Sequence, residues 1–174
     1  MLTLAEADAE LQRLTLLKKN HLDEQYVARR SVRDLLGTIA GLSKRLTDLT
    51  ADQETVTAHA SDPIIIGKRR IARDDVGAAL GAALDTLPTN IREKTRVPLG
   101  TYRGLRFGMV VNPQWNPEVY LEGATTRHDT LSRDHHGPRA VLNALDRLAG
   151  AYSPECPRVK QDLSIAESQL RDFR

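Results

Sequence analysis

The chain has 174 residues, which suits one ordinary domain or a small domain joined to an extended element. Its 25 basic and 23 acidic side chains nearly cancel, so the net charge of +2 favours no class of partner. With two Phe, one Trp and four Tyr, the composition argues against a broad β-sandwich core and favours helical packing.

The compartment is predicted from the single cysteine and from hydropathy. Cys156 has no second cysteine with which to form a disulfide inside the chain, which favours a reducing compartment. No apolar run approaches membrane-spanning length, and the first residues do not resemble a signal peptide. We therefore expect a cytoplasmic protein that makes no contact with a membrane.

Residues 1–61 predict one long helix, because they contain no proline and no glycine before Gly37. Thr3 and Glu6 have the spacing of a capping box, so the helix should begin near Thr3. Lys18, His21 and Gln25 interrupt its apolar seam, and a register change or local unwinding is expected there. The seam has the heptad spacing of a coiled coil and consists of Leu4, Ala7, Leu11, Leu14, Val32, Leu35, Ile39, Leu42, Leu46 and Leu49.

Residues 62–136 predict a small α+β domain. Residues 64–66 are three isoleucines that suit a short buried strand, and Gly67 and Lys68 start a turn. Asp74 or Asp75 caps a second helix, which ends by Pro88. Short connections then predict an antiparallel meander of four strands over residues 97–102, 105–111, 118–122 and 127–131.

Residues 137–174 predict a broken helix. Pro138 suits a first helical position, and the two prolines of residues 153–157 should break or bend the helix. Each half carries an apolar stripe that can pack on the first helix. The expected fold is therefore α+β: a small antiparallel sheet and a helix inserted between two long helices, which form an antiparallel coiled-coil stalk.

Two short motifs suggest catalysis or nucleotide binding and fail in detail. Residues 112–115 (Asn-Pro-Gln-Trp) resemble the Asn-Pro-Pro-aromatic signature of amino-methylating DNA methyltransferases, but a polar proline turn explains them better. Residues 67–70 (Gly-Lys-Arg-Arg) lack the upstream glycine and the Ser or Thr of a phosphate-binding loop.

No metal or cofactor site is predicted. His135 and His136 lie near His128 and Asp129, but neighbouring residues of a strand point to opposite faces, so a solvated loop is the better interpretation. Cys156 has no histidine at a spacing that singles it out, and we expect a structural thiol. The chain therefore shows no active site of its own.

Positive charge is concentrated locally. From Lys68 to Arg106 nine basic residues stand against four acidic ones, a local excess of five in a chain whose whole excess is two. Such a cluster can contact phosphates, although an ordinary solvated rim is an equal alternative at this point. The candidate DNA contacts are Lys68, Arg69, Arg70, Arg73, Arg103 and Arg106.

Residues 64–68 (Ile-Ile-Ile-Gly-Lys), the following helix and residues 99–105 (Leu-Gly-Thr-Tyr-Arg-Gly-Leu) resemble a region of Swi/Snf-type DNA helicase and adenine-specific DNA methylase fusions. These proteins are carried by plasmids and phages, and the similar region lies downstream of their helicase motor. The stretch that ends at Gly137, with Asn143 and Leu145 after it, is also similar. The resemblance covers residues 60–174 and implies a parent that is an ATP-dependent helicase or a DNA methyltransferase. None of the family's catalytic motifs has matching positions here.

Two functions follow as hypotheses. The first is a non-catalytic accessory domain that positions DNA or the motor through sequence-independent contacts with phosphates, and whose other partner is the rest of the parent protein. The alternative is a coiled-coil interaction module that binds a protein partner or a second copy of itself. An enzyme in its own right is the least favoured interpretation, because no set of residues amounts to an active site.

Overall fold

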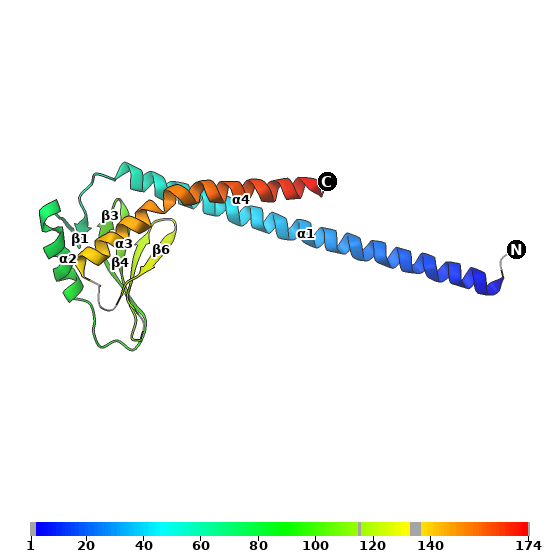
Figure 1. The fold of residues 1–174 in the computed structure, drawn as a ribbon, viewed down its shortest axis with the longest axis horizontal. Coiled ribbons are helices and arrows are strands. Elements are labelled where there is room, and N and C mark those ends of the chain that lie inside the picture. The colour runs from blue at the N-terminus through cyan, green and yellow to red at the C-terminus, as the bar shows by residue number, and fades with distance from the viewer. Residues whose placement is uncertain (1–2, 115, 133–136, 174) are drawn as a thin grey trace. The chain divides into compact units, whose positions relative to one another are not determined.

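The computed structural model describes residues 3–114, 116–132 and 137–173, and it divides the chain into two units. One unit contains Met1–Ser43 and Gln161–Arg174, and the other contains Lys44–Lys160. The helices, labelled in Figure 1, are α1 (Leu4–Ala58), α2 (Val76–Asp85), α3 (Pro138–Gly150) and α4 (Tyr152–Asp172), with a short 3-10 turn at Arg73–Asp75. The strands are β1 (Ile65–Ile66), β2 (Arg69–Arg70), β3 (Thr95–Tyr102), β4 (Leu105–Val111), β5 (Glu118–Glu122) and β6 (Thr126–Thr130).

The 44–160 unit contains one antiparallel sheet in the order β2-β1-β3-β4-β5-β6. The α+β class and the predicted meander of four strands are therefore confirmed. Cross-strand pairs alternate between the two faces of the sheet, as the two-residue period of a strand requires. Phe107 pairs with Leu121, and Met109 pairs with Val119, and all four side chains are buried on the same face.

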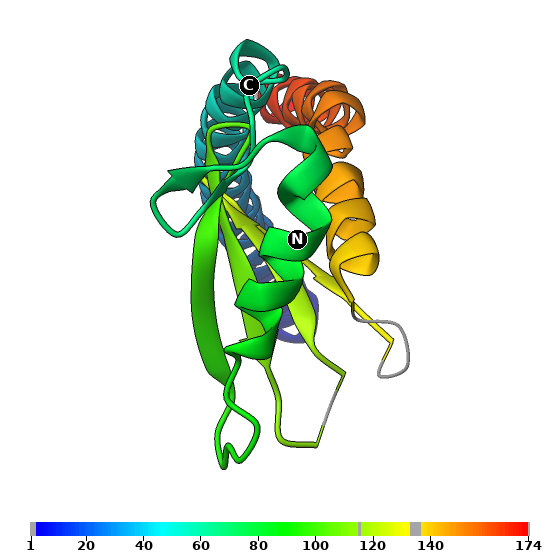
Figure 2. The ribbon, with the colours of Figure 1, turned by 90° about the vertical axis from the view of Figure 1, so that its left-hand side faces the viewer.

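Helices α2 and α3 cover that buried face, as Figure 2 shows. The apolar stripe expected on this segment is present: Val141, Leu145 and Leu148 are buried, and Tyr152 at the start of α4 continues it. In α3 the stripe packs on the sheet and on α2, and not on the first helix as expected. Leu80 is fully buried on α2. At about 1.5 to 3 kcal/mol for each large apolar side chain removed from water, this layer is the main stabilising element of the unit.

The last turns of α1 lie across one end of the sheet, where two hairpin turns meet them. The β3–β4 turn needs left-handed backbone at Arg103 (φ 50°) and Gly104 (φ 81°). A Cβ atom on Gly104 would lie 2.7 Å from Cγ2 of Thr55, so α1 packs directly against this turn. Glycine at position 104 thus satisfies both the turn and the close approach of the helix.

Asp52 joins α1 to the second hairpin turn, between β5 and β6. Its side chain is 2 % exposed, and it accepts hydrogen bonds from the backbone N–H groups of Ala124 (2.7 Å) and Thr125 (2.8 Å). The Thr125 hydroxyl donates a third, at 2.5 Å. A buried carboxylate is tolerated when hydrogen bonds replace its water, and these three donors do so. Charged residues are rarely this buried, so Asp52 is a structural residue.

Along α1, burial changes with position. Every residue from Leu4 to Val27 is exposed, whereas Val32, Leu35, Ile39 and Leu42 are half-buried. In the same unit Leu163 and Leu170 of α4 are half-buried, and Ala166 is buried. The heptad seam is therefore covered only in its second half.

Several local predictions are confirmed at the ends of elements. The capping box forms, since the Thr3 N–H donates to Glu6 Oε2 (3.1 Å) and the Glu6 N–H donates to Thr3 Oγ1 (3.2 Å). Pro138 occupies the start of α3 as expected. The expected aspartate cap of α2 is wrong: Asp75 stands at the N-cap position, but its side chain makes no capping hydrogen bond.

Three other predictions about the elements are wrong. Of the two alternatives expected near Lys18, a register change or local unwinding, the unwinding does not occur, because α1 continues without interruption from Leu4 to Ala58. The break between the last two helices comes at Ala151, before the expected segment 153–157. Pro154 lies in the first turn of α4, where a missing N–H costs nothing, and Pro157 is accommodated inside the helix. Arg69 and Arg70, expected on a turn, form strand β2.

Replacing Asp52 by Ala should lower the free energy of unfolding by about 2 to 4 kcal/mol, because two backbone N–H groups and a hydroxyl lose their acceptor. Urea denaturation of the two proteins measures this difference. Glu54→Ala, an exposed acidic residue on the same helix, is the control and should change the value by less than about 0.5 kcal/mol. Equal midpoints for Asp52→Ala and wild type would show that the turn does not depend on this carboxylate.

Leu49 is 1 % exposed and is the most buried leucine of the seam. Leu49→Ala should cost about 2 to 4 kcal/mol by removing packed methyl groups and leaving a cavity. Leu36, which is 52 % exposed on the same helix, provides the matched control, and its change to Ala should cost less than about 0.5 kcal/mol. The prediction fails if the two substitutions have the same effect on thermal or urea denaturation.

Candidate nucleic-acid interface

The candidate site is the β1–β2 hairpin at the edge of the sheet. β1 pairs with β3 on one side and with β2 on the other, with Ile66 opposite Arg69 and Ile65 opposite Arg70. Gly67 adopts φ 65° at the turn, and its N–H donates to the Leu99 carbonyl (2.7 Å). The Ile71 N–H closes the hairpin on the Ile64 carbonyl (2.9 Å). The basic residues between them are thus carried on a fixed backbone.

Lys68, Arg69, Arg70 and Arg73 are all exposed. None of the four makes an ion pair with an acidic side chain among the residues that the structure describes. Their charge is therefore not neutralised within the described part of the chain. We refer to these four residues as the hairpin cations.

Most of the other basic residues of the segment have acidic neighbours. Arg96 pairs with Glu122 (2.8 Å) and stacks 3.9 Å from the centre of the Tyr120 ring. Arg106, a predicted DNA contact, lies 3.8 Å from the same carboxylate. Lys94 approaches Glu118 at 4.0 Å. Arg92 is exposed and has no ion pair with a described residue. Internal pairing thus leaves the local excess of positive charge mainly on the hairpin cations.

Arg103, the other predicted contact outside the hairpin, is also engaged. It pairs with Asp146 (3.7 Å) and lies over the ring of Tyr102, whose hydroxyl donates to Asp146. Burial, together with that hydrogen bond, raises the pKa of Tyr102 to about 12. Tyr102 therefore remains a neutral donor that holds Asp146 in place.

A cleft of about 750 Å³ lies between this region and Arg73, one of the hairpin cations, and Asp62 and Asp146 also line it. Arg73 and Arg103 line it, and so does Arg139 from the first turn of α3. The structure thus brings two predicted contacts together and adds Arg139, which the sequence analysis missed. Arg139 lies far from the 68–106 segment in sequence, and only its place after the helix-starting Pro138 could have drawn attention to it.

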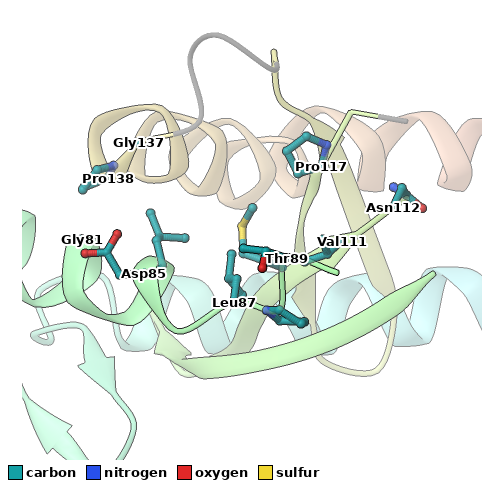
Figure 3. A pocket seen from close by; sticks show the side chains of 12 residues that line it. Gly81, Asp85, Leu87, Thr89, Val111, Asn112, Pro117, Gly137 and Pro138 are labelled. Carbon is teal, nitrogen blue, oxygen red and sulfur yellow. The ribbon is translucent and has the colours of Figure 1, made fainter. Parts of the chain in front are cut away.

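A cleft of about 840 Å³ is mainly apolar and lies between the end of α2, strand β4 and the start of α3 (Figure 3). Leu84, Leu87 and Met109 contribute to its lining, and Asp85 and Asn112 lie at opposite ends of it. Asn112 Nδ2 donates to the Asn116 carbonyl (3.1 Å), so this amide is used within its own turn. That contact agrees with the predicted proline turn between two strands. Trp115 lies outside the described residues.

The residues considered for a metal site are His128, Asp129, His135 and His136. Among the described residues no three His, Cys, Asp or Glu side chains are placed to hold a metal ion. Asp129 pairs with Arg147 (2.7 Å), and His128 faces the Tyr120 ring, with the ring centres 6.4 Å apart. His135 and His136 lie outside the described residues.

A titratable cluster lies where the start of α4 meets β6. Glu155 accepts hydrogen bonds from Arg127 and Arg45, and Arg127 also stacks 4.2 Å from the Tyr152 ring centre. Burial favours a higher pKa for Glu155, but the two arginines outweigh it and hold the pKa below its ordinary value. Burial and the nearby Glu155 raise the pKa of Cys156, so its buried thiol stays protonated and unreactive.

Comparison with known proteins identifies no relative. No protein-family model matches the chain, and no curated protein or solved structure is significantly similar to it. In the described residues no helix is long and apolar enough to cross a membrane.

Because the folded-state pKa of Glu155 is lowered, its contribution to stability is present above its ordinary pKa of 4.5 and is lost as the pH falls through the folded value. Glu155→Gln should lower the free energy of unfolding at pH 7 by about 1 to 3 kcal/mol. The variant should also lose less of its free energy of unfolding between pH 7 and pH 3 than wild type does, and urea denaturation at the two pH values measures this. Glu167→Gln, an exposed change on α4, is the control. The same acid sensitivity in Glu155→Gln and wild type would contradict this assignment.

Proposed function

We propose that the chain is a non-catalytic accessory domain that contacts the phosphate backbone of duplex DNA through the hairpin cations. The observation that carries this proposal is the absence of ion pairs at Lys68, Arg69, Arg70 and Arg73 within the described residues. A cation already paired with a carboxylate must give up that partner to bind a phosphate, whereas an unpaired one only exchanges solvent and counterions. Arg103 and Arg106, each near a carboxylate, are secondary contacts in this proposal.

The expected binding is sequence-independent. Base-specific binding needs side chains that reach base edges or aromatic rings on which bases stack. Near the hairpin, the Tyr102 hydroxyl is bound to Asp146, and Phe107 is completely buried. Guanidinium and ammonium groups on a strand edge suit phosphate oxygens. The proposal therefore includes affinity for the backbone and no preference for sequence.

The helicase or methylase parent also remains a proposal. It rests on the resemblance of residues 64–68 and 99–105 described above, and the comparisons add nothing to it. In such a parent, this chain would hold DNA or the motor while the chemistry takes place elsewhere. The lone Cys156 favours a reducing compartment, and in this proposal that compartment is the cytoplasm.

A second candidate function is a coiled-coil interaction module, and the exposure of α1 favours it. Nine large apolar side chains of this helix are more than half exposed. The half-buried stripe from Val32 to Leu42, and the stripe from Leu163 to Leu170 in the same unit, have the spacing of an antiparallel coiled-coil stalk. The part of the seam before Val32 would then be available to a partner. The nine exposed side chains are Leu4, Leu11, Leu14, Leu16, Leu17, Leu22, Tyr26, Val27 and Leu36.

Replacing Lys68, Arg69 and Arg70 together by Ala should weaken DNA binding most at low salt. Each phosphate contact contributes about 0.9 to the slope of log affinity against log salt concentration, so the slope should fall by up to about three. Fluorescence anisotropy with a random duplex at several salt concentrations measures this slope. The three side chains are exposed, so the stability of the fold should change little.

The matched control replaces Arg13, Lys44 and Arg147, three exposed cations that each pair with a carboxylate, by Ala. This variant has the same net charge as the hairpin variant, and its salt slope should equal that of wild type. If both variants lose affinity equally, the binding reflects net charge alone. If wild type does not bind at low salt, the hairpin cations are a solvated rim and the proposal is wrong.

A further inference from the structure

The exposed half of α1 has an apolar stripe along one side. Leu4, Leu11, Leu14, Leu22 and Tyr26 are each more than half exposed. At 3.6 residues per turn, they fall within a stripe about 120° wide. An isolated helix in water gains little from propensity alone, so such a stripe is stabilised mainly by packing on another surface.

The charges along the same half of α1 form two blocks of opposite sign. Residues 4–12 contain three carboxylates, Glu6, Asp8 and Glu10, and no basic residue. Residues 13–22 contain three basic residues, Arg13, Lys18 and Lys19, and no acidic residue. The half of α1 that carries the stripe therefore has an acidic block followed directly by a basic block, and Asp8 and Lys18 lie on the same side of the helix as the stripe.

We infer that the occupant of this stripe is a second copy of the chain, bound antiparallel over residues 4–22. In that orientation the acidic block of each copy lies along the basic block of the other. A parallel copy would align blocks of the same sign, which is destabilising. Charge complementarity thus selects both the partner and the direction.

The spacing of the leucines gives the register. In this register, the residue numbers of two facing residues, one from each copy, add up to about 25 or 26. Leu4 then lies opposite Leu22 of the second copy, and Leu11 lies opposite Leu14. Because each pair occurs twice, four layers of leucine form over a length of about 28 Å. In the same register Asp8 lies beside Lys18 of the second copy.

The charges needed for these contacts are available. Glu10 pairs with Arg13 of its own helix (2.8 Å), and Glu6 takes part in the capping box. Asp8, Lys18 and Lys19 make no ion pair with a described residue. This inference does not depend on the DNA proposal, since it uses no hairpin cation.

Sedimentation of the full chain between about 1 and 200 µM tests for association, which should raise the mass reversibly to twice that of the monomer. Two charge-swap variants test the blocks: one carries Asp8→Lys with Glu10→Lys, and the other carries Lys18→Glu with Lys19→Glu. Each variant alone should dimerise at least about tenfold more weakly, and an equal mixture should recover the wild-type affinity. Circular dichroism of each variant checks that the helix is retained.

A spin label at Asn20→Cys, in a Cys156→Ala background, tests the direction. In the antiparallel register the two labels lie about 22 Å apart along the axis, whereas parallel copies would hold them about 10 Å apart. A chain that stays monomeric at 200 µM would overturn the inference and assign the stripe to a different partner. A short label distance, or a mixture of variants that stays monomeric, would also overturn it.

Discussion

In the 44–160 unit, the last turns of α1 are joined to the sheet by a buried polar contact, the carboxylate of Asp52 against the β5–β6 turn. Three donors from two residues converge on it, and a Cβ atom on Gly123 would lie only 2.2 Å from Asp52 Oδ1. The β5–β6 turn and α1 therefore pack so closely that no side chain fits at position 123. Because the same turns of α1 also meet Gly104, one helix fixes the ends of both hairpins. Strand β1 pairs with β3, the first strand of the β3–β4 hairpin. The position of the β1–β2 hairpin therefore depends indirectly on the contact between α1 and the two turns.

The electrostatics of the sheet explain why one group of cations differs from the rest. Glu122 on β5 lies near Arg106 on the neighbouring β4 and pairs with Arg96 on β3, one strand further along the sheet, and Asp146 pairs with Arg103. Each of these pairs lies partly exposed, where it contributes little to stability but lowers the local positive potential. The edge strand β2 has only β1 as a neighbour, so no acidic strand lies beside its arginines. This topological reason applies to Arg69 and Arg70, which lie on β2.

Local signals in the sequence predicted much of the fold. The capping box at Thr3, the short runs that form β4 and β5 and the apolar stripe of α3 depend on residues close in sequence, and all are present in the structure. Strand β2 was missed because two residues carry no periodicity. The helix break was misplaced because prolines suit a first turn as well as they end a helix. Other features depend on contacts between residues distant in sequence, which no local pattern reveals. These features are the role of Asp52, the partners of Arg96 and Arg103, and the cleft shared by Arg73 and Arg139.

The central claim is that phosphates bind the hairpin cations, which make no ion pair with a described residue. An amide chemical-shift titration of the labelled full chain with a short random duplex at low salt tests it residue by residue. The account predicts that the largest shifts fall between Gly67 and Arg73, with smaller shifts at Arg103 and Arg139 along the shared cleft. Shifts concentrated in α1 or around the apolar cleft at Met109, with the hairpin unchanged, would contradict it.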